Sequence, residues 1–139
     1  MKLSTLIFGS WLLALACSSR VVEEPAYNFT QSGQASYYAN SLTGNRTASG
    51  AIYHPDSLTA AHRYLPFGTK VLVINSATQR EVIVTINDRG PYHPRRIIDL
   101  SRSAAEQLGI VRVGVATVTV KAELPPSVAD SLRKRLNAE

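Results

Sequence analysis

The stretch "EVIVTINDRGP" (residues 81–91) joins a strand-like apolar run to a polar turn, and this junction is the strongest local indication of the fold. Its β-branched residues are typical of a buried strand. Asn-Asp followed by Gly-Pro is common turn chemistry, so the strand ends at this point. Asp88 therefore has two open interpretations. It stabilises the turn, or it acts as an acid or ligand-binding group.

Further runs of strand length flank this one, and only one helical pattern interrupts them. The predicted strands are 34–39 ("QASYYA"), 70–75 ("KVLVIN"), 80–87 ("REVIVTIN"), 95–100 ("RRIIDL") and 113–123 ("VGVATVTVKAE"). The short "SATQ" between the second and third suits a hairpin connection. Several short strands with a single helix predict a mainly β protein, a small β-barrel with a helical crossover.

The crossover helix is predicted within "DLSRSAAEQLGI" (99–110). Either Ser101 or Ser103 can serve as its N-cap, and Ser103 with Glu106 fits the capping-box pattern. Gly109 suits the left-handed position that follows a helix.

A second helix is predicted over "SVADSLRKRLNAE" (127–139), after two prolines. Its basic run, Arg133 to Arg135, suits the negative end of the helix dipole. A surface that contacts the cell wall or a membrane is the alternative interpretation of that run.

The N-terminal segment "MKLSTLIFGSWLLALACSSR" (1–20) is typical of a secretory signal, which we expect to cover residues 1–16. The apolar run is too short for an ordinary membrane-spanning helix. A buried core helix is the alternative.

Cys17 is the only cysteine, so it forms no internal disulfide. "LALAC" resembles a bacterial lipoprotein box, which implies that Cys17 becomes a diacylated first residue, with 17–32 as a tether. The alternative is that Cys17 leaves with the signal. Ser18 in the next position implies anchoring in the outer membrane, facing the periplasm.

Composition and charge limit the classes of molecule that the chain is expected to bind. The chain has 139 residues, 45% hydrophobic and 18% charged, as expected of one packed domain. A formal net charge of +5 favours anionic partners. For an exported chain we expect no nucleic acid among them; the nearest abundant anionic polymer outside a bacterial membrane is the cell wall.

Asp88 is the best acid candidate among the carboxylates of the compact region. Asp56 lies in a predicted turn, and Asp99 is expected to favour the positive end of the following helix. The histidines form no compact metal motif, although a zinc site from His54, His62 and Asp88 is conceivable. We expect no metal and no cofactor.

Six stretches occur in an order that resembles the rare lipoprotein A (RlpA-like) family. They are "GQASYYA", "TASG", "LTAAHRYLPFGTKVLVIN", "VIVTINDRGPY", "RIIDLSRSAAEQLGI" and "GVATVTV", within about residues 33–121. The resemblance implies a six-stranded double-psi β-barrel over 33–122, and the helix predicted from the residues makes 123–139 a helical tail. The resemblance also implies endolytic peptidoglycan transglycosylation, which cuts glycan strands between N-acetylmuramic acid and N-acetylglucosamine and leaves a 1,6-anhydro end.

The resemblance also assigns candidate roles by position. Asp88 matches the Asp of the family's "NDRG" motif and is the candidate acid and base; His62 matches the "TAAH" histidine and is the candidate for orienting or polarising the substrate. The candidate substrate contacts are Tyr38, His54 and Arg89. We expect Asp88, His62 and Tyr38 to line one groove.

The chain departs from the family pattern at several positions. Ala51 stands where the family has a Glu, and His54 where an Asp follows the aromatic residue. Tyr37 replaces a Trp. Two interpretations therefore stay open: a transglycosylase that uses Asp88, or a non-catalytic, expansin-like glycan binder or structural wall lipoprotein.

Overall fold

The computed structural model describes residues 25–139, so the predicted signal, Cys17 and the start of the tether lie outside the described residues. The strands are β1 (Phe29–Tyr37), β2 (Thr59–Ala61), β3 (Lys70–Asn75), β4 (Glu81–Asp88), β5 (Arg96–Leu100) and β6 (Ala116–Ala122). The helices are the short 3-10 helix η1 (Asn40–Leu42), α1 (Arg102–Leu108) and α2 (Pro126–Leu136).

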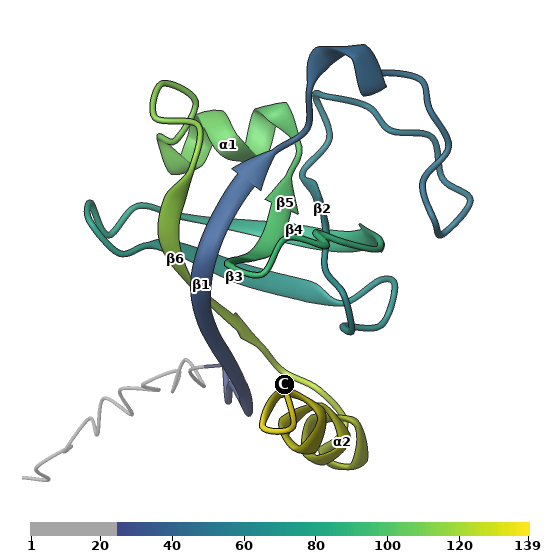
Figure 1. The fold of residues 1–139 in the computed structure, drawn as a ribbon, viewed down its shortest axis with the longest axis vertical. Helices are drawn as coiled ribbons and strands as arrows, with labels where there is room; N and C mark the ends of the chain where they lie inside the picture. Colours follow the sequence, from purple (N-terminus) through teal and green to yellow (C-terminus); the bar gives the residue numbers. More distant parts are fainter. Residues whose placement is uncertain (1–24) are drawn as a thin grey trace, which may run out of the picture.

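The six strands close into a barrel in the order β1-β5-β2-β4-β3-β6 (Figure 1). Two neighbouring pairs, β1 with β5 and β2 with β4, run parallel, and the other four are antiparallel. Helix α1 lies over one end of the barrel and α2 at the other. The predicted six-stranded barrel with a crossover helix and a C-terminal helix is confirmed.

Alternating burial along β3 and β4 builds the core. Val71 and Val73 are fully buried, as is Ile86, while the intervening side chains are partly or fully exposed. The two strands form the predicted hairpin, with Val71 opposite Val84. This burial period of two is the pleat of a strand with one face toward the core.

Strand β1 begins earlier than predicted, at Phe29, so the last residues of the expected tether (17–32) belong to the barrel. Two contacts explain the difference. The Phe29 side chain joins the core, and the Asn28 side-chain amide bonds both the N–H and the carbonyl of Leu124. Strand β6 starts at Ala116, three residues later than predicted.

Strand β2 was not predicted. Its three residues, "TAA", are too few to show a period and lack the β-branched enrichment of its neighbours. Pairing with β4 on one side and β5 on the other makes it a strand.

Helix α1 is capped by Ser101, whose side chain accepts from the Ala104 N–H at 3.3 Å. The predicted capping box of Ser103 with Glu106 is wrong, because Glu106 instead pairs with the Arg102 guanidinium at 3.0 Å. Gly109 ends the helix in the left-handed region, as predicted.

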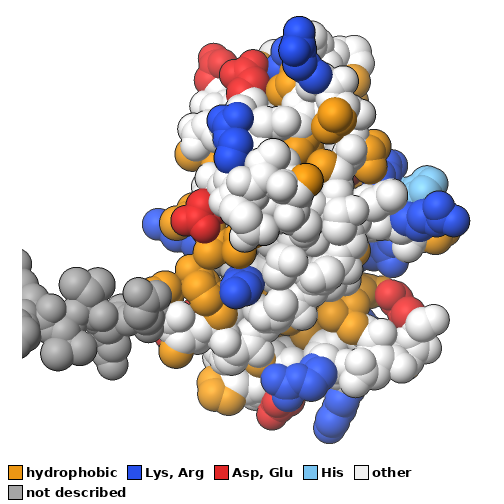
Figure 2. Space-filling model, turned by 90° about the vertical axis from the view of Figure 1, so that its left-hand side faces the viewer, with side chains coloured by type: hydrophobic (Ala, Val, Ile, Leu, Met, Phe, Trp, Pro, Cys, Tyr) orange, Lys and Arg blue, Asp and Glu red, His pale blue; other side chains and the backbone are white. Residues whose placement is uncertain are grey.

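Helix α2 is confirmed and packs Ala129 and Leu132 against the end of the barrel. A cavity of about 350 Å³ lies between this helix and β1. Figure 2 shows basic and acidic side chains interspersed with apolar ones at the α2 end. None of the helices within residues 25–139 has the length and apolarity needed to cross a bilayer.

The two serines near the start of α1 give a matched test of the cap. Ser101→Ala removes the cap and should lower the free energy of unfolding by about 1 kcal/mol. Ser103→Ala removes no hydrogen bond and should change the free energy of unfolding by only about 0.3 kcal/mol. Urea denaturation measures both, and equal losses would contradict the assignment of the cap.

Candidate functional site

Asp88 is the last residue of β4, and its half-buried carboxylate accepts three hydrogen bonds. The Tyr38 hydroxyl donates to Oδ2 at 2.5 Å. The amide N–H groups of Ala48 and Arg89 donate to Oδ1 at 2.8 and 2.9 Å. Asp88 therefore stabilises the turn, as one interpretation of the sequence held, and its role as an acid or ligand-binding group stays a prediction.

The long segment between β1 and β2 reaches over the end of β4 and forms one side of the site (Figure 1). Its tight turn is fixed there because the Ser49 N–H donates to the Asn87 carbonyl at 3.2 Å, beside the bond from Ala48 to Asp88. Ala51 closes this turn through its carbonyl, and its methyl group is exposed. Position 51, where the resemblance implies a Glu, therefore belongs to the turn that binds Asp88.

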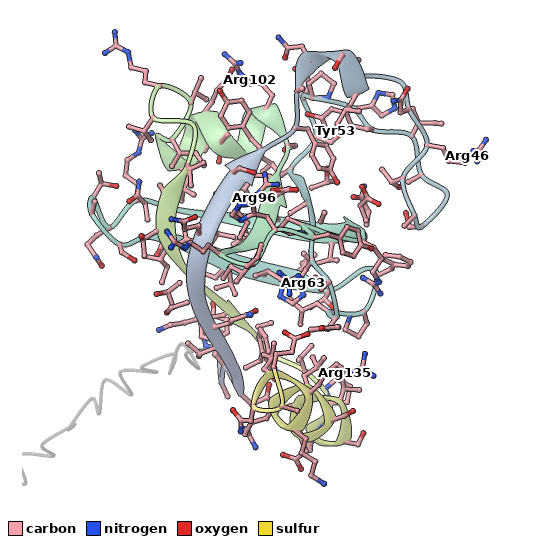
Figure 3. All side chains as sticks on the ribbon, in the orientation of Figure 1. Arg46, Tyr53, Arg63, Arg96, Arg102 and Arg135 are labelled. Carbon is pink, nitrogen blue, oxygen red and sulfur yellow. The ribbon has the colours of Figure 1, made fainter. Side chains whose placement is uncertain are left out.

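Tyr38 follows β1 directly and is held by its N–H bond to the Leu100 carbonyl at 2.9 Å. Its ring packs edge to face on the ring of buried Tyr53, with the ring centroids 4.7 Å apart. Tyr53 belongs to the long segment, and Figure 3 shows it where that segment meets the barrel. Burial, and then the hydrogen bond to Asp88, raise the pKa of Tyr38 well above its ordinary value. Its hydroxyl therefore keeps its proton and acts as a fixed donor to Asp88.

His62 is buried and its ring is fully engaged. Nδ1 accepts from the N–H groups of Tyr64 and Leu65 at 3.0 and 3.1 Å, and Nε2 lies 2.9 Å from Gln31 Oε1. This pattern assigns the proton to Nε2. Burial, and then the charges of Arg89 and Arg63, lower the pKa of His62 to about 4, so the ring is neutral near pH 7.

The structure brings Tyr38 to Asp88 but does not bring the His62 ring to either of them. The bond between His62 and Asp88 is a backbone one, from the His62 N–H to the Asp88 carbonyl at 3.2 Å. The ring instead lines a small cavity of about 90 Å³ with Gln31 and Arg63. The expectation of one groove with all three side chains is therefore wrong for His62, because the amides of Tyr64 and Leu65 and the Gln31 side chain hold its ring in this other cavity.

Arg89 is turned away from Asp88. Its guanidinium donates to the carbonyls of Leu65 at 2.8 Å and His62 at 3.2 Å, and lies 3.9 Å from the centre of the Phe67 ring. The side chain thus links the end of β4 to the 62–67 loop.

Arg63 makes the reciprocal connection, from the loop after β2 to the loop after β4. It donates hydrogen bonds to the carbonyls of Pro91 at 2.7 Å and His93 at 2.8 Å. We call the contacts of Arg63 and Arg89 together the arginine clasp. It locks the two loops that follow β2 and β4 together.

His54 is exposed on the long segment, and its carbonyl accepts from the Ser57 N–H. The structure does not gather His54, His62 and Asp88 into one site. Within residues 25–139 no group of three or more His, Cys, Asp or Glu side chains is placed to hold a metal ion.

A second carboxylate that sequence reasoning treated as a helix charge belongs to a polar cluster. Asp99 accepts from the Ser36 hydroxyl at 2.5 Å and pairs with Arg96, which also donates to Ser36 at 2.7 Å. Ser101, rather than Asp99, caps the helix. Asp99 and Ser36 are paired across parallel strands 63 residues apart, which no local pattern reveals.

With this geometry in place, the chain can be compared with known proteins. A family model described as "Lytic transglycolase" matches residues 30–120, nearly the whole barrel. The chain belongs to this RlpA-like family of lytic transglycolases.

Relatives named endolytic peptidoglycan transglycosylase RlpA share 43–50% identity with the chain. The Yersinia pestis protein is 50% identical over 93 residues, which cover 67% of this chain and 26% of the relative. The Vibrio cholerae protein is 43% identical over 104 residues, which cover 75% and 39%. The chain spans less than half the length of these relatives.

Solved structures show the same fold at low identity. A Streptomyces papain inhibitor matches with a TM-score of 0.57 and 24% identity, covering 70% of this chain and 97% of its own. An expansin from Clavibacter michiganensis matches with a TM-score of 0.55 and 23% identity, covering 70% and 52%. These likenesses support the double-psi β-barrel.

The buried His62 predicts a pH dependence of stability. Its pKa is about 4 in the folded protein and about 6.5 unfolded, so the unfolded chain binds the extra proton between these values. The free energy of unfolding should therefore have its full value above about pH 6.5. It should fall by roughly 2 to 3 kcal/mol when the pH is lowered to about 4.5.

Urea denaturation at both pH values tests this. His62→Asn keeps an acceptor near the position of Nδ1 but has no titrating ring. The free energy of unfolding of this variant should therefore fall less between pH 6.5 and pH 4.5, by the contribution predicted for His62. An unchanged loss in this variant would contradict a neutral, buried His62.

Proposed function

We propose that the barrel is a peptidoglycan lytic transglycosylase domain that uses Asp88 as its acid and base. The observation that carries the proposal is the Asp88 carboxylate itself. It stands at the family's motif position, is partly exposed, and is fixed by three neutral donors without a paired guanidinium. Family membership over residues 30–120 supports the same reaction class.

The chemistry needs one group that first donates a proton and then accepts one. Asp88 would protonate the glycosidic oxygen, so that the bond to C1 of the N-acetylmuramic acid breaks. The C6 hydroxyl of that sugar would attack C1 and return its proton to Asp88, which closes the 1,6-anhydro ring. No water enters the product, so a second carboxylate to activate water is not required.

The hydrogen bonds indicate which oxygen would exchange the proton. A carboxylate offers about four lone-pair positions. Oδ1 uses two for the amides of Ala48 and Arg89, and Oδ2 uses one for Tyr38. The free position is on Oδ2, where the retained proton of the Tyr38 hydroxyl would stabilise the carboxylate after it has given its own proton away.

A second candidate, a non-catalytic glycan-binding lipoprotein, is favoured by one observation. Ala51 puts a methyl group in the turn that binds Asp88, where the family has a Glu. If that Glu supplies the proton in relatives, the site here retains the fold and the binding surface without its acid.

Product analysis distinguishes these functions. Incubation of purified glycan strands with the protein should release fragments with 1,6-anhydro ends, detected by mass spectrometry. Asp88→Asn should lower the rate by roughly 10²- to 10⁴-fold, because it removes the proton-transfer group.

A matched variant sharpens the assay. Ala51→Glu restores the family residue in the turn beside Asp88 and should raise the rate above that of the natural chain. Strands that bind and stay intact with both the natural chain and Ala51→Glu would reject the enzyme and support the binding module.

We further propose that Cys17 carries a lipid that holds the domain to the periplasmic face of the outer membrane. The apolar segment 1–16, the lipoprotein-box pattern before Cys17 and the following Ser18 support this placement. A di- or triacylated cysteine gives firm anchoring, whereas one chain binds a bilayer only weakly.

Metabolic labelling with radioactive palmitate tests the anchor. The natural chain should take up label and sediment with outer membranes, and Cys17→Ser should lose both properties. Ser18→Ala leaves the acceptor thiol in place and should keep the label. A natural chain that stays unlabelled would contradict the proposal.

A further inference from the structure

We propose that a cavity at the arginine clasp is a second binding site for peptidoglycan, which holds a sugar ring together with a carboxylate. The cavity has a volume of about 340 Å³ and is lined by Arg63, Tyr64, Tyr92 and Pro94. We call it the tyrosine pocket. The inference rests on the proposed peptidoglycan substrate and adds a site that the motif at Asp88 does not supply.

The contacts of Arg63 bring the two sides of the tyrosine pocket together. Its guanidinium donates to the carbonyls of Pro91 and His93, the residues on either side of Tyr92. Because Arg63 directly precedes Tyr64, this one side chain ties the loop of one tyrosine to the loop of the other. Walls that are fixed before a ligand enters lose little conformational freedom on binding, which favours affinity.

The lining of the pocket suits the face of a sugar. Tyr92 is 81% exposed and contributes an open aromatic surface. Tyr64 is half-buried and lines the same cavity with the apolar ring of Pro94. The face of an aromatic ring carries partial negative charge, which attracts the weakly positive C–H groups of a pyranose ring. Two tyrosines in one cavity therefore provide a surface on which a sugar can stack.

A carboxylate of the protein itself shows what the polar wall of the pocket binds. The Tyr64 hydroxyl donates to the Glu139 carboxylate, whose Oε2 lies 3.6 Å from Arg63 Nη1. In the described part of the chain, Nε and Nη2 of Arg63 bind backbone carbonyls, which leaves Nη1 for a carboxylate. Arg63 and Tyr64 line both the tyrosine pocket and the small cavity that contains Glu139, so a ligand carboxylate in the pocket can replace Glu139 on this pair.

The charges around the pocket favour an anionic ligand. The Arg135 guanidinium lies 5.1 Å from the centre of the Tyr64 ring, and Arg95 directly follows Pro94 in the chain. Figure 3 shows Arg63 on the barrel and Arg135 on α2 below it. The ion pairs formed within residues 25–139 include neither Arg95 nor Arg135. Such positive charge raises the local concentration of anions.

Peptidoglycan combines a sugar ring and a carboxylate in one repeating unit. N-acetylmuramic acid is a pyranose with a lactyl group, whose carboxylate is free in bare strands that lack stem peptides. In strands that carry stem peptides, this carboxylate forms an amide bond and the free carboxylates belong to the peptide. The two kinds of strand therefore distinguish the source of the carboxylate that the pocket binds.

Binding of purified strands tests the site in an Asp88→Asn parent, in which the proposed reaction is blocked. Tyr92→Ala removes the exposed ring and should weaken binding about tenfold. Tyr64→Phe keeps the ring but removes the hydroxyl group that binds a carboxylate, and should weaken binding about threefold. Tyr27→Ala removes an exposed ring that precedes β1 and should have no effect.

Glu139→Gln should change binding in the opposite direction. The new amide keeps an acceptor for the Tyr64 hydroxyl but removes the negative charge beside Arg63. A ligand carboxylate then meets no competing anion, so binding should become about threefold tighter. Chito-oligosaccharides, which have sugar rings but no carboxylates, should bind about tenfold more weakly than bare strands and should not respond to this substitution.

Tighter binding of bare strands than of peptide-bearing strands assigns the lactyl carboxylate, and the reverse order assigns the peptide. Equal binding by the parent and by folded Tyr92→Ala and Tyr64→Phe variants, with folding checked by thermal unfolding, would overturn the tyrosine pocket. The proposed function would still stand in that case, because the natural chain's release of 1,6-anhydro products is measured separately. Chito-oligosaccharides that bind as tightly as bare strands would overturn the recognition of a carboxylate.

Discussion

Closure of the barrel through the three-residue strand β2 is the constraint on which the site depends. Ala61 is paired with Asp88 of β4 on one side and with Asp99 of β5 on the other. Fully buried Ala60 lets the neighbouring strands approach over a small side chain. Without this pairing the strand ends that carry the two carboxylates would not lie on the same side of the molecule.

The two carboxylates beside β2 have opposite electrostatic surroundings. Asp99 pairs with the Arg96 guanidinium and accepts from Ser36, so its charge is compensated within the fold. Among residues 25–139, the hydrogen-bond donors to the Asp88 carboxylate are neutral, and the guanidinium of Arg89 instead binds backbone carbonyls. The fold thus compensates the charge of Asp99 with a guanidinium, whereas the described contacts of the Asp88 carboxylate are with an amide N–H pair and a hydroxyl group.

His62 connects the same parts of the molecule through hydrogen bonds of its ring and backbone. Its Nδ1 caps the turn that follows β2, and the carbonyls of this turn bind Arg89. A residue at a family motif position can therefore act through the backbone that it organises. The deep burial that lowers the pKa of His62 also keeps its ring neutral near neutral pH.

The sequence by itself determined the elements whose signals are local. The β-branched runs 70–75 and 80–87 with their short connection predicted the central hairpin, the serine caps and Gly109 around 101–109 predicted α1, and the motif order predicted the double-psi barrel. It also singled out Asp88 as the candidate acid, a role that stays a prediction. Each of these follows from neighbouring residues, or from a motif, without knowledge of distant contacts.

Only the tertiary structure decided where the side chains point and what they bind. "TAA" became a strand because two partners pair with it, and β1 extends to Phe29 because that ring enters the core. The direction of the His62 ring, the clasp of Arg63 and Arg89, and the Asp99–Ser36 contact join residues far apart in the chain. Such contacts depend on barrel closure and register, which no local pattern encodes.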